Sequence, residues 1–245
     1  MTEYRCDLHI HSCLSPCGDD EMTPANIVGM AVVNGLQIVA LTDHNSAKNC
    51  PAFFAQAKAY GIVPIPGMEL TTGEDIHVVC LFRSLEDAME FERIVEEHRM
   101  LIPNEPDIFG HQYIMDENDE ISGEEECLLI NATDLYLEDA YELVKNLGGV
   151  CYPAHIDRNS NGVIAMLGTF PEEPKFTAYE LNGADSEEEY RDRFPIIRDL
   201  VHTVSSDAHY LWDIAEEGFV IGIDDEPYSS ANVRNKLIDY LSGKE

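Results

Sequence analysis

The feature that most constrains this chain is a repeated alternation of short apolar segments with amphipathic helical segments. The apolar segments are continuous rather than alternating with polar residues, for example at 38–41 and 178–181. Continuous apolar strands are typical of a sheet buried on both faces, and strands that alternate with helices are typical of parallel sheets. The pattern therefore predicts a parallel sheet covered by helices.

Cap residues and glycines place the helices between these strands. The predicted helices run from Thr23-Pro24 to about Gly35, from Ser46 to Gly61, from Ser84 to about Arg99, from about Thr133 to Leu147, and onward from about Ser186 and about Ser229. The predicted strands cover 6–11, 38–41, 62–65, 78–82, 150–152, 178–181, 201–205 and 219–223.

The chain has 245 residues, which suits one barrel-sized α/β domain with its own core. We expect this single domain to extend over residues 1–245. One stretch, from about 101 to 126, is acidic, punctuated by Gly and Pro, and weakly periodic. We interpret it as an inserted lobe or lid.

The charge balance is strongly acidic, with 47 Asp and Glu against 15 Lys and Arg and a formal net charge of -32. Nucleic-acid duplexes are bound through phosphate-neutralising Lys and Arg, and an acidic surface repels polyanions. From the charge we therefore expect no nucleic-acid polymer as a partner, although small nucleotides remain compatible with it.

The seven cysteines are an odd number without framework spacing, which favours reduced thiols in a cytoplasm over a disulfide scaffold. No apolar run approaches the length of a membrane span, and the first residues do not form a basic and then apolar signal. We expect a cytoplasmic protein without a membrane partner.

Histidines and carboxylates stand where the predicted strands end or begin. Alternation along the first strand puts Asp7, His9 and His11 on one face, so two imidazoles can converge on one cation. The others of this kind are Asp43, His44, Glu69, His77, His155, Asp207 and His209. The strand ends of a β/α barrel share one rim, where the chemistry of such barrels is built, so this placement predicts a common site.

The motifs resemble those of the PHP (polymerase and histidinol phosphatase) superfamily. They are Asp7-Leu8-His9-Ile10-His11-Ser12, Leu41-Thr42-Asp43-His44-Asn45, Gly67-Met68-Glu69, Ala154-His155 and Ser205-Ser206-Asp207-Ala208-His209, in the family's order over almost the whole chain. The resemblance implies a distorted (β/α)7 TIM-like barrel, up to three metal ions and phosphoester hydrolysis. By motif, the implied metal ligands are His9, His11, His44, Glu69, His77, His155, Asp207 and His209.

Mixed imidazole and carboxylate ligands suit Zn, Mn or Fe without choosing among them. Such ions polarise phosphoryl oxygens and lower the pKa of a water. Glu69, with two oxygens, is the natural bridge between two ions. Asp43 either orients the neighbouring ligand or relays a proton, and we favour the orienting role. His209 could protonate a leaving alkoxide, although we expect it to be a ligand.

Two departures from the family pattern concern the loops. Ile156 follows His155, where the family usually has proline. The acidic residue or histidine that follows the first motif is displaced, and counting from either side points to Cys17 or to Asp19. We favour Asp19, because the capped helix at Thr23-Pro24 fixes its distance.

Three further residues lie near the motifs. Arg158 is either a phosphate clamp, since a guanidinium matches phosphate bidentately, or a surface salt-bridge partner. Tyr210 and Trp212 either pack at the rim or stack on a base.

We expect the substrate to be a small phosphomonoester such as a nucleoside 3′,5′-bisphosphate.

Other functions compete with this one. An amidohydrolase-type barrel also begins with His-x-His, but it usually bridges its metals with a carbamylated lysine, and no lysine here ends a predicted strand. Within the family the alternatives are histidinol-phosphate phosphatase and exonuclease, and the charge disfavours the latter. A non-catalytic metal-binding regulatory module is the alternative from another class.

Overall fold

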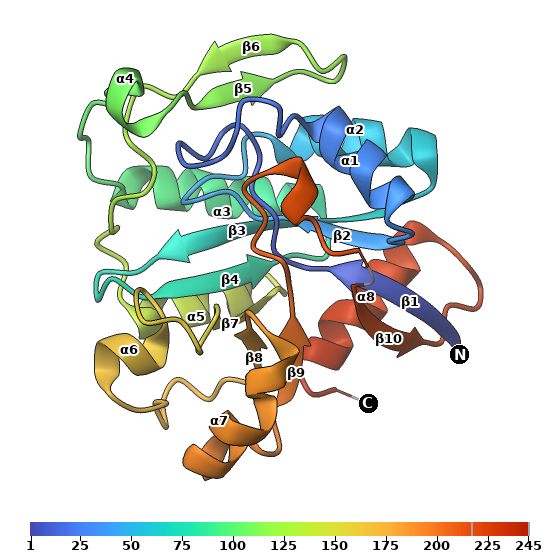
Figure 1. Cartoon of the computed structure of the whole chain (residues 1–245), viewed down its shortest axis with the longest axis vertical. Coiled ribbons are helices and arrows are strands. Elements are labelled where there is room, and N and C mark those ends of the chain that lie inside the picture. The colour runs from blue at the N-terminus through green and yellow to red at the C-terminus, as the bar shows by residue number, and fades with distance from the viewer. Residues whose placement is uncertain (217, 245) are drawn as a thin grey trace.

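The computed structural model describes residues 1–216 and 218–244 (Figure 1). Its helices are α1 (Pro24–Val33), α2 (Cys50–Tyr60), α3 (Leu85–His98), α4 (Pro106–Phe109), α5 (Leu137–Asn146), α6 (Val163–Leu167), α7 (Glu187–Arg193) and α8 (Ser230–Leu241). Its strands are β1 (Thr2–Asp7), β2 (Ile38–Leu41), β3 (Val63–Thr71), β4 (His77–Leu81), β5 (Tyr113–Met115), β6 (Ile121–Glu124), β7 (Val150–Pro153), β8 (Ala178–Leu181), β9 (Val201–Val204) and β10 (Phe219–Ile223). Short 3-10 helices occupy Ala184–Ser186, Pro195–Ile197 and Leu211–Asp213.

A six-stranded sheet in the order β10-β1-β2-β3-β4-β7 forms the framework of the fold. β1, β2 and β3 are parallel, whereas β10, β4 and β7 each pair antiparallel with a neighbour. The expectation of a parallel sheet is therefore only partly right. Residues 72–76 alone join β3 to β4, and a parallel crossover needs about a dozen residues or more.

Two further strands continue the curl of this sheet. β8 and β9 pair in parallel, and the Ile156 amide beyond β7 donates to the Glu180 carbonyl of β8. An isolated parallel bridge joins Ile10, after β1, to Ala208, after β9, which brings the two ends of the curl together. The fold is thus the predicted α/β class, a distorted TIM-like barrel built on a curled sheet (Figure 1).

The central strands are buried on both faces, as the continuous apolar pattern predicts. Ile38 and Ala40 of β2 belong to a core cluster that also contains Leu237 of α8. Val39 and Leu41 face the other way, into a cluster lined by residues of α1, α2 and α3. Burial on both faces stabilises the strands whose ends carry the polar residues.

The predicted helix starts are largely correct. The side chains of Thr23, Ser84 and Ser229 each accept a backbone N–H in the first turn of their helices. Ser46 and Thr133 are exceptions, because α2 begins only at Cys50 and α5 only at Leu137. Among the described residues, no helix is both long and apolar enough to cross a membrane.

The segment at about 101–126 forms α4 and the β5–β6 hairpin, which lies at one side of the barrel in Figure 1. The hairpin is fastened to the loop after β1, where the Tyr113 amide donates to the Cys13 carbonyl at 2.8 Å. It is also fastened to the start of α1, where Asp119 accepts from the Ala25 amide at 2.9 Å. The lobe therefore supports the loop that follows the first histidine motif.

Candidate metal centre

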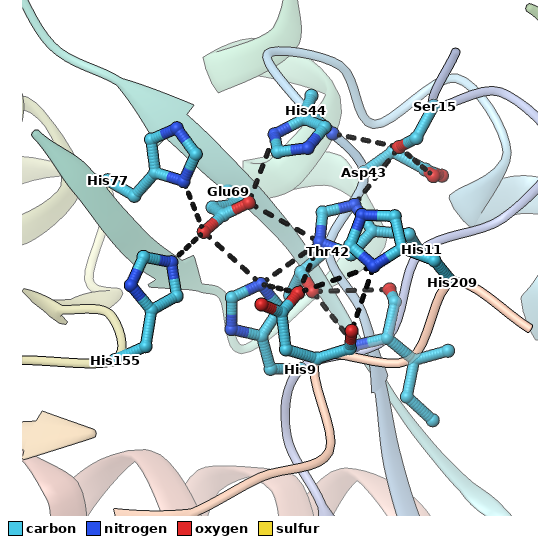
Figure 2. Close-up of polar contacts among 12 residues, drawn as sticks. His9, His11, Ser15, Thr42, Asp43, His44, Glu69, His77, His155 and His209 are labelled. Atoms are coloured by element: carbon cyan, nitrogen blue, oxygen red, sulfur yellow. Dashed lines mark hydrogen bonds and ion pairs between the residues drawn. The ribbon is translucent and has the colours of Figure 1, made fainter. Parts of the chain in front are cut away.

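The side chains that the motifs singled out meet at one rim of the barrel (Figure 2). β1 ends at Asp7, so the predicted strand 6–11 is too long, and His9 and His11 lie in the segment beyond it. His77 opens an antiparallel strand, and its partner in the ladder is Thr71 at the end of β3. The start of β4 therefore reaches the same rim as the ends of the parallel strands.

Glu69 is the hub of this rim. Its carboxylate is 1% exposed, and Figure 2 shows imidazole rings arranged around it. The rings with a nitrogen within 3.4 Å of a Glu69 oxygen are those of His9, His11, His44, His77 and His155. Both carboxylate oxygens are engaged, Oε1 by the His77 Nδ1 at 2.8 Å and Oε2 by the His44 Nδ1 at 3.0 Å.

Asp207 supplies a second buried carboxylate. Its Oδ1 lies 3.0 Å from the His11 Nε2 and 3.4 Å from the His9 Nε2. Side chains whose ligand atoms all lie within 4.8 Å of one another form three groups, namely His9–His11–Glu69–Asp207, His44–Glu69–His77 and His11–His44–His209. The groups share His11, His44 and Glu69, as expected for neighbouring cation sites.

The donor set fits transition-metal ions by its unsatisfied atoms. Nδ1 of His44, Nδ1 of His155 and Oδ1 of Asp207 are buried, and none has a hydrogen-bond partner of suitable geometry among the described residues. The His44 Nδ1 lies close to Glu69 without pointing a hydrogen at it. Buried polar atoms are rarely left without a partner, and a bound cation would satisfy such atoms at His44 and Asp207, which belong to the ligand groups.

Two of the six described non-glycine residues with positive φ belong to the centre. His155 has φ +27° and Asp207 has φ +51°, values that residues other than glycine seldom adopt. Such a conformation costs about 1–3 kcal/mol and persists where the surroundings impose it. Here it turns both side chains toward Glu69 and His11.

Glu180, in β8, holds His9 in one tautomer. Its Oε1 lies 2.8 Å from the His9 Nδ1 and also accepts the His155 amide at 3.2 Å. Because Nδ1–H donates to the carboxylate, the His9 Nε2 lone pair faces Glu69 and Asp207.

Asp43 holds His11 through a serine. The Ser15 hydroxyl donates to the Asp43 Oδ1 at 2.7 Å and accepts from the His11 Nδ1 at 3.1 Å. This leaves the His11 Nε2 lone pair facing Asp207. Asp43 also accepts from the Ser12 amide and hydroxyl, so its carboxylate lies behind the rim rather than in it.

His209 closes the group on the side away from Glu69. Its ring lies 4.2 Å from the His11 ring, centroid to centroid, with an interplanar angle of 22°. Nδ1–H donates to the Asp207 carbonyl at 2.8 Å, which leaves Nε2 as the atom that can bind a cation.

The two carboxylates and the rings shift one another's pKa values. Although burial lowers it, the carboxylates of Asp207 and Glu69 raise the pKa of His11 to about 9. Burial and the neighbouring His11 lower the pKa of His44 to about 4 and that of His209 to about 3. His44 and His209 are therefore neutral donors, whereas at His11 a bound cation would take the place of the proton that the two carboxylates hold there.

Arg158 lies at the mouth of the site, with its side chain 41% exposed and its Nη1 2.6 Å from the Asp207 Oδ2. Its Nη2 donates to the Asn182 Oδ1 at 3.1 Å. Arg158 is therefore a partly exposed salt-bridge partner of a buried carboxylate of the centre.

The structure does not bring Cys17 or Asp19 into any of the three groups. The Asp19 carboxylate accepts the Glu21 amide at 2.9 Å, and its own amide donates to the His209 carbonyl. Cys17 is exposed.

Glu180 and Ser15 were not predicted from the sequence. Glu180 has the feature by which the other site residues were predicted, a carboxylate near the end of an apolar strand. It was not predicted because none of the family motifs contains it. Nothing local marks Ser15, because its role depends on the fold that brings it to Asp43.

A distorted α/β barrel that gathers buried imidazoles and carboxylates at one rim defines a metal-dependent hydrolase. The chain belongs to the PHP domain family, whose model matches residues 7–160. Members of this family are hydrolases that bind several divalent metal ions.

Curated relatives match segments of the chain. An uncharacterized protein of Methanocaldococcus jannaschii is 28% identical over 116 residues, 42% of this chain and 67% of that protein. A 5'-3' exoribonuclease of Haemophilus influenzae is 36% identical over 78 residues, 31% of this chain. The match spans only 27% of that exoribonuclease.

Solved structures share the fold at lower identity. The lesion-specific endonuclease Q of Pyrococcus furiosus has a TM-score of 0.59 and 20% identity, covering 86% of this chain and 49% of its own. A putative metal-dependent phosphoesterase of Bifidobacterium adolescentis has a TM-score of 0.56 and 20% identity, covering 97% of this chain and 96% of its own.

The expectation that nucleic-acid polymers are excluded as partners is wrong. The similar proteins include an exoribonuclease and an endonuclease Q solved with a 27-mer duplex substrate. The net charge of -32 is summed over the whole surface, whereas a nucleic acid meets only the charges near the site. Screening shortens the reach of distant surface charges to about 8 Å at physiological salt.

Proposed function

We propose that this chain hydrolyses phosphoester bonds of nucleotides, with a small phosphomonoester such as a nucleoside 3′,5′-bisphosphate as substrate. The observation that carries the proposal is the buried Glu69 carboxylate, with imidazole nitrogens on both of its oxygens, inside overlapping ligand groups. Overlapping groups that share a carboxylate suit a centre of two or three ions, as phosphoryl-transfer chemistry uses.

The residues that would hold these ions are the members of the three groups together with His155, whose Nε2 lies 3.0 Å from the Glu69 Oε1. The donor set of nitrogen and oxygen is compatible with Zn, Mn and Fe. The chemistry that divalent ions supply at such a centre is polarisation of the phosphoryl oxygens and activation of a water.

The chain's own groups orient the ligands and the substrate. Glu180 fixes His9, and Asp43 fixes His11 through Ser15, which favours an orienting role for Asp43 over a proton relay. Arg158 can place its exposed guanidinium nitrogens on a phosphate while it remains beside Asp207.

The role of His209 follows from its tautomer. Because Nδ1–H is bound to the Asp207 carbonyl, only Nε2 is free, and it faces His11 and His44. We therefore assign His209 to the ligands rather than to protonation of the leaving alkoxide. As part of the same proposal, residues 1–245 act as one domain, with the lobe at about 101–126 supporting the loop after the first motif.

A second candidate is cleavage of a nucleic-acid strand. It is favoured by the similarity to the exoribonuclease and to endonuclease Q, which was solved with a 27-mer duplex substrate. The same centre serves both candidates, because each breaks a phosphoester bond.

The test is a side-by-side assay of the manganese-loaded protein. Substrates are para-nitrophenyl phosphate, a nucleoside 3′,5′-bisphosphate, and single-stranded RNA and DNA oligonucleotides. The first candidate predicts release of phosphate from the bisphosphate at a higher kcat/KM than cleavage of any oligonucleotide. Faster cleavage of an oligonucleotide would favour the second candidate. No turnover of any substrate by metal-loaded protein would favour a non-catalytic metal-binding module.

A further inference from the structure

Two stacked aromatic side chains stand at the edge of the centre, immediately after its last motif. The rings of Tyr210 and Trp212 lie 4.9 Å apart, centroid to centroid, with an interplanar angle of 16°. Tyr210 is 39% exposed and Trp212 is 72% exposed. An indole normally contributes most of its area to a core or an interface, so this exposure calls for an explanation.

Hydrogen bonds hold the segment that bears the Tyr210–Trp212 pair in place. The His209 carbonyl before it accepts the Asp19 amide at 2.9 Å, and the Asp213 amide donates to the Tyr210 carbonyl at 3.0 Å. After it, the Asn34 Nδ2 donates to the Ile214 carbonyl at 2.9 Å, and Ile214 is buried. The rings therefore project from an anchored turn, and their exposure is not the result of a loose loop.

The pair also lies within reach of the ligand groups. The His209 ring is 4.2 Å from the His11 ring, and Trp212 follows His209 by three positions in the sequence. Three residues span at most about 11 Å of chain. A ligand with a phosphate at the centre and an aromatic ring at its other end could therefore touch both.

Charge favours an uncharged mode of recognition here. Asp213, beside the pair in the sequence, is an acidic residue and supplies no cation to bind a second anionic group. Stacking on an aromatic face requires no charge and accepts any base, because every base has a π-face. Two rings are also far smaller than the roughly 800 Å² per partner that a stable protein interface buries.

We propose that the Tyr210–Trp212 pair is a nucleobase-binding subsite, on which the base of a nucleotide stacks while its phosphate lies at the metal centre. This inference rests on the proposed hydrolysis of nucleotide phosphoesters and specifies which part of the substrate is recognised outside the centre. The base would stack on the outer face of Trp212, the more exposed of the two rings, as the third ring of the stack.

The first test uses the indole itself, because Trp212 is the only tryptophan of the chain. The metal-loaded protein is titrated with adenosine, which has a base and no phosphate, and with ribose 5-phosphate, which has a phosphate and no base. Quenching of the tryptophan fluorescence by adenosine but not by ribose 5-phosphate is expected. No quenching by adenosine up to millimolar concentration, or equal quenching by both, would overturn the proposal.

The second test separates recognition of the base from the chemistry. Trp212→Ala should raise KM for adenosine 5′-monophosphate roughly 10-fold more than KM for ribose 5-phosphate, because stacking on one aromatic ring contributes about that factor. Trp212→Phe keeps a ring and should recover most of the difference. Tyr60→Ala removes an aromatic residue that is 59% exposed at the end of α2, and it should leave the ratio unchanged.

The two proposals fail in different ways. Equal effects of Trp212→Ala on both substrates, with hydrolysis intact, would remove the subsite and leave the proposed function standing. Adenosine binding that Trp212→Ala weakens, measured by calorimetry in a protein that hydrolyses neither phosphate, would support the subsite and remove the proposed function.

Discussion

The inner part of the centre and its mouth are built differently. Inside, His9, His11 and Glu69 are at most 1% exposed, and each is held by several contacts. At the mouth, the Arg158 side chain is 41% exposed and Trp212 is 72% exposed, and they come from the loops after β7 and β9. The difference suggests that buried groups carry the chemistry, which needs fixed geometry, whereas exposed groups choose the substrate.

The largest effect should come from the inner part. His9→Ala combined with His11→Ala removes two ring nitrogens that face Glu69 and Asp207. We expect loss of bound metal and a fall in hydrolysis beyond the roughly 10- to 100-fold that follows the loss of an orienting partner. Elemental analysis and turnover measure this.

The matched control is His98→Ala combined with His111→Ala, two exposed histidines that pair with Asp134 and Glu124. The control should keep its metal and its activity. Full activity in the His9 and His11 variant, with circular dichroism unchanged, would mean that the first motif is structural and that the inner part does not carry the chemistry.

A smaller effect is expected from a residue that orients a ligand ring but is not itself in a ligand group. Glu180→Gln keeps the shape of the side chain but weakens the hydrogen bond that it accepts from the His9 Nδ1–H. Metal affinity or kcat should fall about 10- to 100-fold with little change in thermal stability. Glu189→Gln, on the exposed side of α7, is the control. An unchanged metal affinity in Glu180→Gln would show that His9 does not need its partner.

At the mouth the effect should fall on substrate binding. Arg158→Ala should raise KM about 10-fold or more and change kcat less, because a charge-assisted hydrogen bond contributes roughly 1.5–3 kcal/mol. Arg198→Ala, an exposed arginine paired with Asp192, should leave KM unchanged. Unchanged kinetics in Arg158→Ala would reduce the residue to a salt-bridge partner of Asp207.

The smallest effect is expected in the loop after the first motif. Asp19→Asn should lower metal content or kcat more than Cys17→Ser, because the Asp19 carboxylate accepts the Glu21 amide and so holds the loop whose main chain bonds the His209 carbonyl, whereas Cys17 is exposed. The opposite order, seen by elemental analysis and kinetics, would transfer the role to Cys17. No effect from either would mean that neither side chain is a ligand.

Much of the site could be predicted from the sequence because strand ends are local features. His9, His44, Glu69 and Asp207 were found by their place beside apolar runs, and the parallel part of the sheet brings such ends to one rim. The strands at 38–41 and 178–181 match β2 and β8, since continuous burial leaves a continuous apolar run.

Tertiary structure alone decided the rest, because the deciding contacts join residues far apart in the chain. The partner of His9 is Glu180, 171 positions away, and Asp43 reaches His11 only through Ser15. The direction of β4 depended on the short turn before it and on its ladder with β3. The sequence by itself determined which side chains can hold a metal. The fold determined which lone pairs face one point, because orientation is set by hydrogen bonds across the barrel.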